Sequence, residues 1–226
     1  MWWSTKCKLG HTHHVWVQQK SHSCSVACIM MALHRVGKLD VAKKKVIQKV
    51  PGLKELYQTK KKKKEPWLTE GELRLATQHA HKGGYRPVPK DVSGAKETML
   101  SKLMSGMKGM DPSIHHGTSG LGPVAATLNW LNVKCQFQHK PSSKSVLAYL
   151  KGVQWWHPVV AGVRWTGGFE HAVLVDCATK LKNGDYEICI CDPAGEVHTI
   201  CVPAKLETLA LYPDKGVFMN EVVYVP

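Results

Sequence analysis

The sequence has no apolar run long enough to cross a membrane. Its longest apolar stretch, Cys24 to Leu33, is about half of the ~20 residues that a transmembrane helix requires. The amino terminus also lacks the apolar core and the small-residue cleavage site of a general secretory signal peptide. We therefore expect a protein without a membrane span that is cytoplasmic or is exported by a specialised secretion route.

Acidic residues are scarce relative to basic ones. The chain has 31 Lys and Arg against 17 Asp and Glu, a formal net charge of +14, which favours acidic partners. It lacks both a basic stripe interleaved with aromatic residues and a recognisable reading motif, so nucleic acid is not an expected partner. The basic runs Lys43 to Lys45 and Lys60 to Lys64 are interpreted as solvated segments rather than a binding patch.

The eight cysteines form neither a CxxC pair nor a spacing typical of a small disulfide scaffold. A chain of 226 residues does not need such a scaffold to be stable. The nearest approach to a metal site is Cys7 with His11, His13 and His14, but this spacing is not that of a zinc motif. We interpret this region as an exposed polar amino-terminal arm, and we predict no metal and no cofactor.

The composition, 43% hydrophobic and 21% charged, excludes a largely disordered chain. No repeat or low-complexity linker divides the sequence, so we predict a single domain over residues 1–226. Its parts are an amino-terminal arm (1–17), a helical lobe (about 18–135) and a β lobe (about 136–226). A helical half followed by a mostly antiparallel sheet is an α+β arrangement.

Three helices are expected in the helical lobe. Apolar residues recur at helical spacing over Ser25–Val36, and Gly37 should end this buried helix. Thr69 and Glu72 form a capping box at the start of a second helix. Pro123 is typical of the first turn of a third.

The β lobe should begin with a short helix, Ser143–Lys151, and continue in runs rich in β-branched residues. Asn183-Gly184 lies between two of these runs and predicts a hairpin turn. The strands are expected at Pro158–Trp165, His171–Cys177, Tyr186–Cys191, Glu196–Val202 and Val222–Val225.

Cys24 is the strongest candidate for a nucleophile. It falls at the start of the buried helix, where unpaired amides and the helix dipole favour a thiolate. Cys28, one turn further along, is interpreted as a structural cysteine of the core. Position alone leaves the structural alternative open for Cys24 as well.

A nucleophilic thiol needs a base, and the base needs an orienting group. His171 opens a strand, and Asp192 ends the strand that follows it. With a hairpin between them, the two side chains should come within hydrogen-bonding reach. The alternatives are that His171 is a surface histidine and Asp192 a turn residue, or that Asp176 is the orienting acid.

The order Gln18, Cys24, His171 and Asp192 resembles that of the papain-like cysteine peptidases. The closest likeness is to the bacterial branch that includes the double-glycine leader peptidases, which process bacteriocins. Gln18 lies six residues before Cys24, the separation that those families use for the oxyanion-hole glutamine. The likeness covers residues 15–33 and 142–202 well, and it is weak between Gly37 and Phe137.

Smaller features of the likeness and two departures concern the surroundings of these residues. Glu170 to Val173 resembles the segment around the family's catalytic histidine, and Leu147 to Gly152 resembles the helix that leads up to it. Ser25 stands where the family usually has glycine, and Ser23 stands where aspartate is frequent. We expect Ser23 still to cap the helix.

The resemblance implies a papain-like fold and a mechanism. Cys24 would attack a carbonyl, His171 would transfer the proton, and Asp192 would hold the imidazole. Gln18 and the Cys24 amide would bind the oxyanion. Because no exporter follows in this sequence, we predict a stand-alone cysteine peptidase, an effector or toxin, rather than a leader peptidase.

Two other functions are compatible with the same residues. An acyltransferase or amidase would share the thioester intermediate, and a non-enzymatic basic module could use the fold as a scaffold. The predicted partners are a protein or peptide substrate, with acidic ones favoured by the charge, and an immunity or inhibitor protein. Binding of nucleic acid or an acidic protein that weakens with salt and does not depend on Cys24 would indicate the non-enzymatic module.

Overall fold

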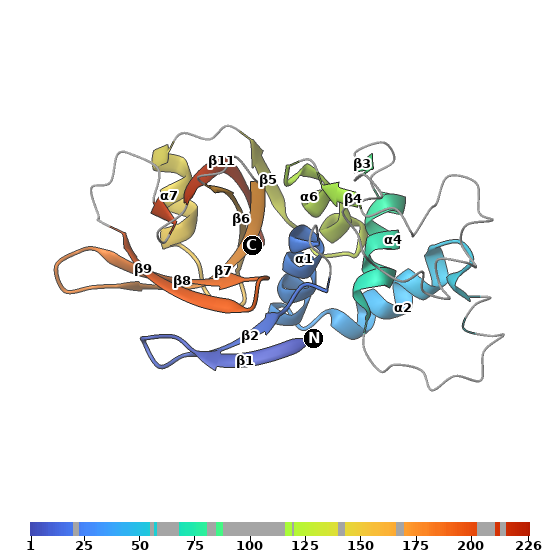
Figure 1. Cartoon of the computed structure of the whole chain (residues 1–226), viewed down its shortest axis with the longest axis horizontal. Helices are drawn as coiled ribbons and strands as arrows, with labels where there is room; N and C mark the ends of the chain where they lie inside the picture. Colours follow the sequence, from blue (N-terminus) through green and yellow to red (C-terminus); the bar gives the residue numbers. More distant parts are fainter. Residues whose placement is uncertain are drawn as a thin grey trace.

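The computed structural model describes residues 1–19, 23–54, 57, 68–80, 85–87, 116–118, 120–139, 143–165, 170–202, 211–212 and 216–226. The run Lys60 to Lys64 lies outside these residues. The described part has a helical half and a mostly antiparallel β half, and helix α1 lies between them (Figure 1). The expected α+β arrangement is therefore present.

Helix α1 (Cys24–Arg35) is the core of the helical half, because all but two of its residues are buried. Its bounds agree with the prediction to within one residue. Helix α2 was not among the expected helices. The bounds of the other helices given for the described residues are α2 (Leu39–Lys49), α4 (Glu70–Ala80), α6 (Gly122–Trp130) and α7 (Ser143–Lys151).

The capping box before α4 is confirmed. The Glu72 amide donates to Thr69 Oγ1 at 3.2 Å, and the Thr69 amide donates to Glu72 Oε2 at 2.8 Å. The expected side-chain cap of α1 by Ser23 is wrong. Ser23 has φ −108° and ψ 17° and makes no capping bond through its side chain, because a side-chain cap needs the extended conformation.

The main sheet of the described residues has seven strands. Strands β10, β11, β6, β7, β8 and β9 follow one another in this order, β5 pairs with β11, and all pairs are antiparallel. The expected strands are all present, with changes at their ends. The bounds are β5 (Gln136–His139), β6 (Val159–Trp165), β7 (Glu170–Lys180), β8 (Tyr186–Asp192), β9 (Glu196–Val202), β10 (Leu211–Tyr212) and β11 (Gly216–Tyr224).

Strand β7 carries a bulge at Asp176. Leu174 pairs with Cys191, but Cys177 pairs with Cys189, so Asp176 is an extra residue on β7. A bulge bends its strand and redirects the side chains beside it. The sequence of β7 has an uninterrupted apolar run, Ala172 to Val175, before Asp176, and such a run does not show where a bulge lies.

The prediction of an exposed amino-terminal arm is wrong. Strands β1 (Trp2–Lys6) and β2 (Thr12–Trp16) form a hairpin that packs under the β half (Figure 1). His13 is completely buried and Cys7 nearly so. Their partners are about 170 residues away in the sequence, so local spacing could not indicate the burial. Strands β3 (Tyr85–Pro87) and β4 (His116–Thr118) form a further antiparallel two-stranded sheet.

The sheet separates two hydrophobic clusters. Ala172 and Leu174 face the cluster around α1, and Val173 and Val175 face the cluster under α7, as the alternation of strand side chains requires. This packing brings the start of α1 close to the start of β7. None of the described helices is both long and apolar enough to span a membrane.

Candidate active site

Cys24 is the first residue of α1 and is half-buried. It lines a small cavity of about 30 Å³ together with His171, and Gly120, Gly162 and Met219 lie on its walls. As a first-turn residue, Cys24 has a backbone amide with no partner within the helix. The thiol therefore lies next to a histidine and a backbone N–H that the helix itself does not pair.

His171 and Asp192 are in contact, as the hairpin predicted. His171 Nε2 lies 2.8 Å from Asp192 Oδ1, and the carboxylate is almost fully buried. The register of β7 and β8 makes the two residues diagonal rather than opposite neighbours, since Leu174 already pairs with Cys191. With Nε2 directed at Asp192, Nδ1 is the nitrogen left for Cys24.

Asp192 is held by its own turn. The Ala194 amide donates to Asp192 Oδ1 at 2.7 Å. Sequence reasoning did not identify His198, whose Nε2 lies 4.0 Å from Asp192 Oδ2 and 3.2 Å from Glu196 Oε2. Its position on β9, beside the Asp-Pro turn, could not be inferred before the pairing of β8 with β9 was known.

The electrostatics of the site favour a charged imidazole. Burial lowers the pKa of His171, but hydrogen bonds to Asp192 and Cys24 and the charges of both raise it to about 10. Cys28 behaves differently: burial, followed by the charges of Cys24 and Asp192, raises its pKa well above the ordinary thiol value. Cys28 therefore stays protonated in the core, as expected of a structural cysteine.

The two adjacent glutamines lie in different surroundings. Gln18 is half-buried, and its backbone N–H donates to the carbonyl of Pro193 at 2.8 Å, beside Asp192. Gln19 is exposed, and its backbone N–H donates to Glu70 Oε2 at 2.9 Å. The segment before Cys24 is thus attached at one end to the Asp192 turn, while the role of the Gln18 side chain remains a prediction.

Glu70 is a buried residue that sequence reasoning missed. Its carboxylate accepts hydrogen bonds from the Trp16 indole at 3.1 Å and from Arg74 at 3.0 Å, besides the Gln19 amide. A buried carboxylate with three donors fixes the path of the chain that carries the glutamines. The first turn of an amphipathic helix offered no signal for this role.

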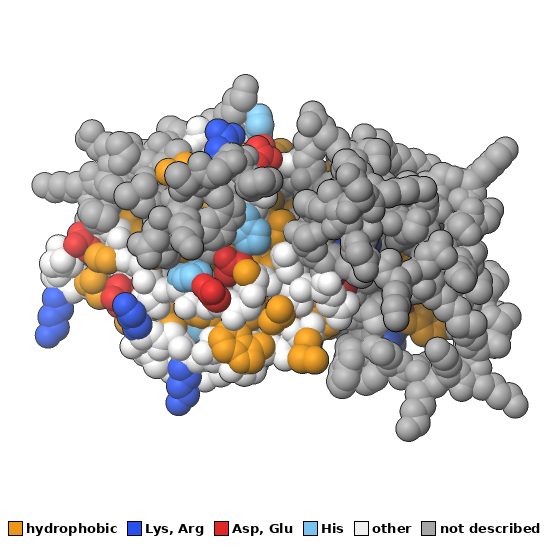
Figure 2. Space-filling model, in the orientation of Figure 1, with side chains coloured by type: hydrophobic (Ala, Val, Ile, Leu, Met, Phe, Trp, Pro, Cys, Tyr) orange, Lys and Arg blue, Asp and Glu red, His pale blue; other side chains and the backbone are white. Residues whose placement is uncertain are grey.

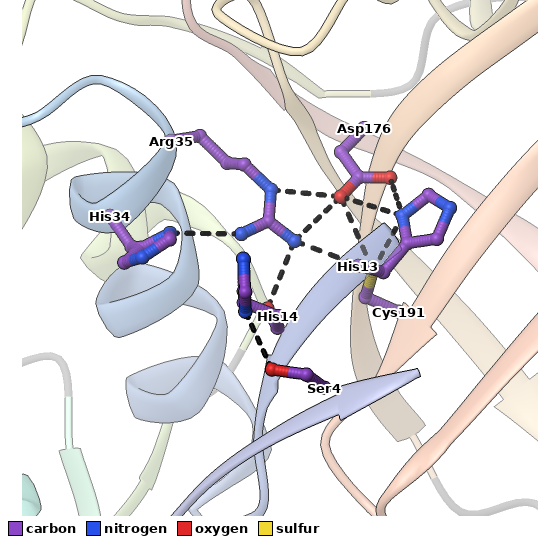
Figure 3. A network of polar contacts seen from close by, with 7 residues as sticks. All are labelled: Ser4, His13, His14, His34, Arg35, Asp176 and Cys191. Carbon is purple, nitrogen blue, oxygen red and sulfur yellow. Dashed lines mark hydrogen bonds and ion pairs between the residues drawn. The ribbon is translucent and has the colours of Figure 1, made fainter. Parts of the chain in front are cut away.

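Asp176 is not the orienting acid of His171. Its carboxylate is buried between His13, at 2.9 Å, and Arg35, at 2.6 Å (Figure 3). Burial raises the pKa of Asp176, but these two partners lower it below its ordinary value. Asp192 is therefore the carboxylate that contacts His171.

Histidine and acidic side chains gather in the middle of one face of the molecule, beside apolar ones (Figure 2). On the described part of this face, the Lys and Arg side chains stand apart from one another and form no continuous patch (Figure 2). Two lysines of the run Lys43 to Lys45 have partners within the chain: Lys45 Nζ donates to Asn132 Oδ1 at 2.9 Å, and Lys43 Nζ lies 5.9 Å from the centre of the Tyr57 ring. The interpretation of the two lysine runs as solvated segments stays a prediction.

Searches for similar proteins give no relative from which a role could be transferred. No protein-family model matches the sequence, and no curated protein is similar to it. The function of the protein is therefore inferred from the residues of its own chain.

Proposed function

We propose that the protein is a cysteine peptidase that acts through Cys24, His171 and Asp192. The observation that carries the proposal is the 2.8 Å contact of His171 Nε2 with Asp192, next to a thiol that shares its cavity. Nucleophile, base and orienting group are thus adjacent in the order that acyl transfer requires. The order Gln18, Cys24, His171 and Asp192, which resembles that of papain-like peptidases, adds support. The papain-like fold is proposed together with the activity.

In the first half of the reaction, the Cys24 thiolate attacks the carbonyl carbon of a peptide bond. The oxyanion is bound by the Cys24 amide and the Gln18 side chain. His171, held by Asp192, donates its proton to the leaving nitrogen as the C–N bond breaks. The products are a free amine and a thioester on Cys24.

In the second half, water replaces the amine. His171 takes a proton from the water, whose oxygen attacks the thioester carbonyl. Collapse of the second tetrahedral intermediate releases a carboxylic acid and restores the thiolate–imidazolium pair. An acyltransferase would use another nucleophile in place of water, so product analysis separates the two reactions.

Alkylation by iodoacetamide tests the charged pair. At pH 7 the imidazolium of His171 should stabilise the thiolate, because its pKa of about 10 keeps it protonated. We expect Cys24 to be alkylated at least tenfold faster than the exposed Cys201, measured by mass spectrometry of digests. In His171→Gln the rate at Cys24 should fall to that of Cys201. A rate at Cys24 that is indifferent to His171 would contradict the proposed pair.

Peptide hydrolysis itself is tested by adding the protein to a cell lysate and identifying new amino termini. Cleavage at a shared sequence pattern, absent with Cys24→Ala, would support a peptidase. Acyl groups transferred to added amines, without new termini, would instead indicate the acyltransferase. Neither product, together with an unreactive Cys24, would favour the non-enzymatic module.

The two glutamines should differ in their effect on turnover. Removing an oxyanion donor typically lowers turnover about 100- to 1000-fold, and Gln18 has the six-residue separation from Cys24. Gln18→Ala should therefore lower kcat by this factor with little change in KM. Gln19→Ala should be near neutral, because that side chain is exposed. The reverse order would show that the oxyanion assignment is displaced by one residue.

A further inference from the structure

A second cluster of reactive side chains lies between the amino-terminal hairpin and the bulged part of β7 and β8. Cys7 follows β1, His13 is on β2 and Cys189 is on β8. All three are buried, and one ligand atom of each lies within 4.8 Å of the others. None of them belongs to the proposed peptidase site, so the cluster needs a separate explanation.

His13 is oriented like a metal ligand. Its Nδ1 lies 2.9 Å from Asp176 Oδ1 (Figure 3), and its buried Nε2 has no hydrogen-bond partner in the described residues. Histidines that bind metals commonly donate one ring N–H to a carboxylate, which leaves a lone pair on the other nitrogen. An unpaired buried nitrogen is costly, and a metal ion at Nε2 would remove that cost.

Cys177 adds a third thiol to the cluster. It pairs with Cys189 across the two strands because the bulge places Asp176 and Cys177 together opposite Cys189. Cys177 and His13 also line the same cavity beside the cluster. Cys177 is thus the cross-strand neighbour of one member of the cluster and shares a cavity with another.

An adjoining group, in which Cys191 joins His13 and Asp176, is a poor cation site. Arg35 donates to Asp176 Oδ2 through Nε at 2.8 Å and lies 3.8 Å from Cys191 Sγ (Figure 3). A buried guanidinium at this distance would repel a metal ion. Asp176 thus accepts hydrogen bonds from Arg35 and His13, and it is not expected to bind the metal ion itself.

We propose that Cys7, His13, Cys177 and Cys189 bind one zinc ion that fastens the amino-terminal hairpin to the main sheet. Three thiolates and one imidazole are a ligand set that selects zinc in a tetrahedral site. Cys7, His13 and Cys189 already lie together, and Cys177, opposite Cys189 on the neighbouring strand, would complete the site by a rotation of its side chain. A cavity of about 460 Å³, lined by His13 and Cys177 among others, gives the ion a route to the cluster.

The proton balance of binding follows from the ligand states. Zinc binds thiolates and neutral imidazole, so each ligand that is protonated at its binding atom beforehand, a thiol or the Nε2 of a doubly protonated His13, releases one proton. The Nδ1–H of His13 continues to donate to the Asp176 carboxylate, and Nε2 binds the zinc ion. No oxidant or reductant takes part, and the site is structural because all four ligand positions are filled by the protein.

The test uses the full chain with Cys24→Ala, which removes the other cysteine–histidine pair as a competing zinc site. Fully reduced, chelator-treated protein is titrated with zinc against a chromophoric chelator, and bound metal is counted by mass spectrometry. We expect about one zinc per chain and a higher Tm in its presence. Cobalt substituted for zinc should give the thiolate charge-transfer band and the intense visible bands of a tetrahedral site.

Variants identify the ligands. Cys7→Ser and Cys189→Ser should each weaken zinc binding by at least about 100-fold, the upper range for loss of a mere supporting residue. Cys201→Ser is the matched control, because this exposed cysteine lies on the neighbouring strand β9, and it should leave zinc affinity unchanged. Zinc should also protect Cys7, Cys177 and Cys189, but not Cys201, from a maleimide pulse.

Two results would overturn the proposal without relying on the ligand variants. One is a reduced, folded Cys24→Ala chain that binds no zinc and gives no tetrahedral cobalt spectrum. The other is a disulfide among Cys7, Cys177 and Cys189 in protein isolated without reductant, which would assign these thiols a covalent role. Neither result bears on peptidase activity, since Cys24 and His171 are outside the cluster.

Discussion

Replacement of Cys24 by alanine is expected to lower peptide turnover by roughly 10⁶-fold, the order of magnitude seen when the nucleophile of a triad is removed. The fold should remain intact, because Cys24 is only half-buried and alanine is the best helix former. Turnover is measured on peptides that contain the cleaved sequences found in the lysate. Urea unfolding of the same samples should give nearly unchanged midpoints.

Cys28→Ala is the matched control for this prediction. Cys28 lies one turn further along α1, is fully buried, and has a pKa raised by burial and nearby charges. The change should cost about 1 kcal/mol of unfolding free energy through the small cavity it leaves, while turnover is mostly retained. If both variants were folded and equally inactive, Cys24 could not be identified as the nucleophile.

Local sequence signals predicted local structure well. The capping box of Thr69 and Glu72 marks the first turn of α4 in the structure, and helix α7 has the predicted bounds. The Asn183-Gly184 turn has a glycine at φ +90° between β7 and β8. The hairpin brings His171 and Asp192 to the same end of β7 and β8, as predicted, but their contact also depends on the bulge at Asp176, which shifts the register of the two strands by one residue.

Features that depend on distant pairing could not be predicted. Strand β2 has three polar residues, Thr12 to His14, followed by two apolar ones, a pattern that does not indicate a buried His13, and the partner of His13, Asp176, lies on β7. The bulge that redirects Asp176 leaves no mark on the apolar pattern. Once the hairpin packs on the sheet, His13 lies in two groups of side chains, one with Cys7 and Cys189 and the other with Asp176 and Cys191.

The largest stability effect is expected at the buried ion pair between α1 and β7. The side chains of Arg35 and Asp176 are fully buried, with Nη2 and Oδ2 2.6 Å apart. Arg35 also donates to the His14 carbonyl at 2.9 Å and stacks on Trp155, with its guanidinium carbon 4.1 Å from the ring centre. The pair therefore joins the end of α1 to the bulged strand and to the amino-terminal hairpin.

Asp176→Asn should lower the unfolding free energy by about 3 to 5 kcal/mol, because it leaves the Arg35 charge buried without a counter-charge. Arg35→Met should lower the unfolding free energy by a similar amount, since it leaves the Asp176 carboxylate buried without the Arg35 counter-charge. Urea unfolding with a chelator present keeps zinc release out of the comparison. Arg164→Met is the control: Arg164 and Glu170 lie 3.7 Å apart but are more than half exposed, so the loss should stay below about 1 kcal/mol.

The double variant Arg35→Met/Asp176→Asn separates the ion pair from general damage to packing. Removing both charges leaves no unpaired ion, and replacement of buried pairs by neutral groups is often tolerated. The double variant should therefore lose at least about 2 kcal/mol less than the two single losses added together. If the double variant lost the sum of the two single losses of unfolding free energy, the two side chains would stabilise the protein by filling space. Their charges would then contribute no interaction between α1 and β7.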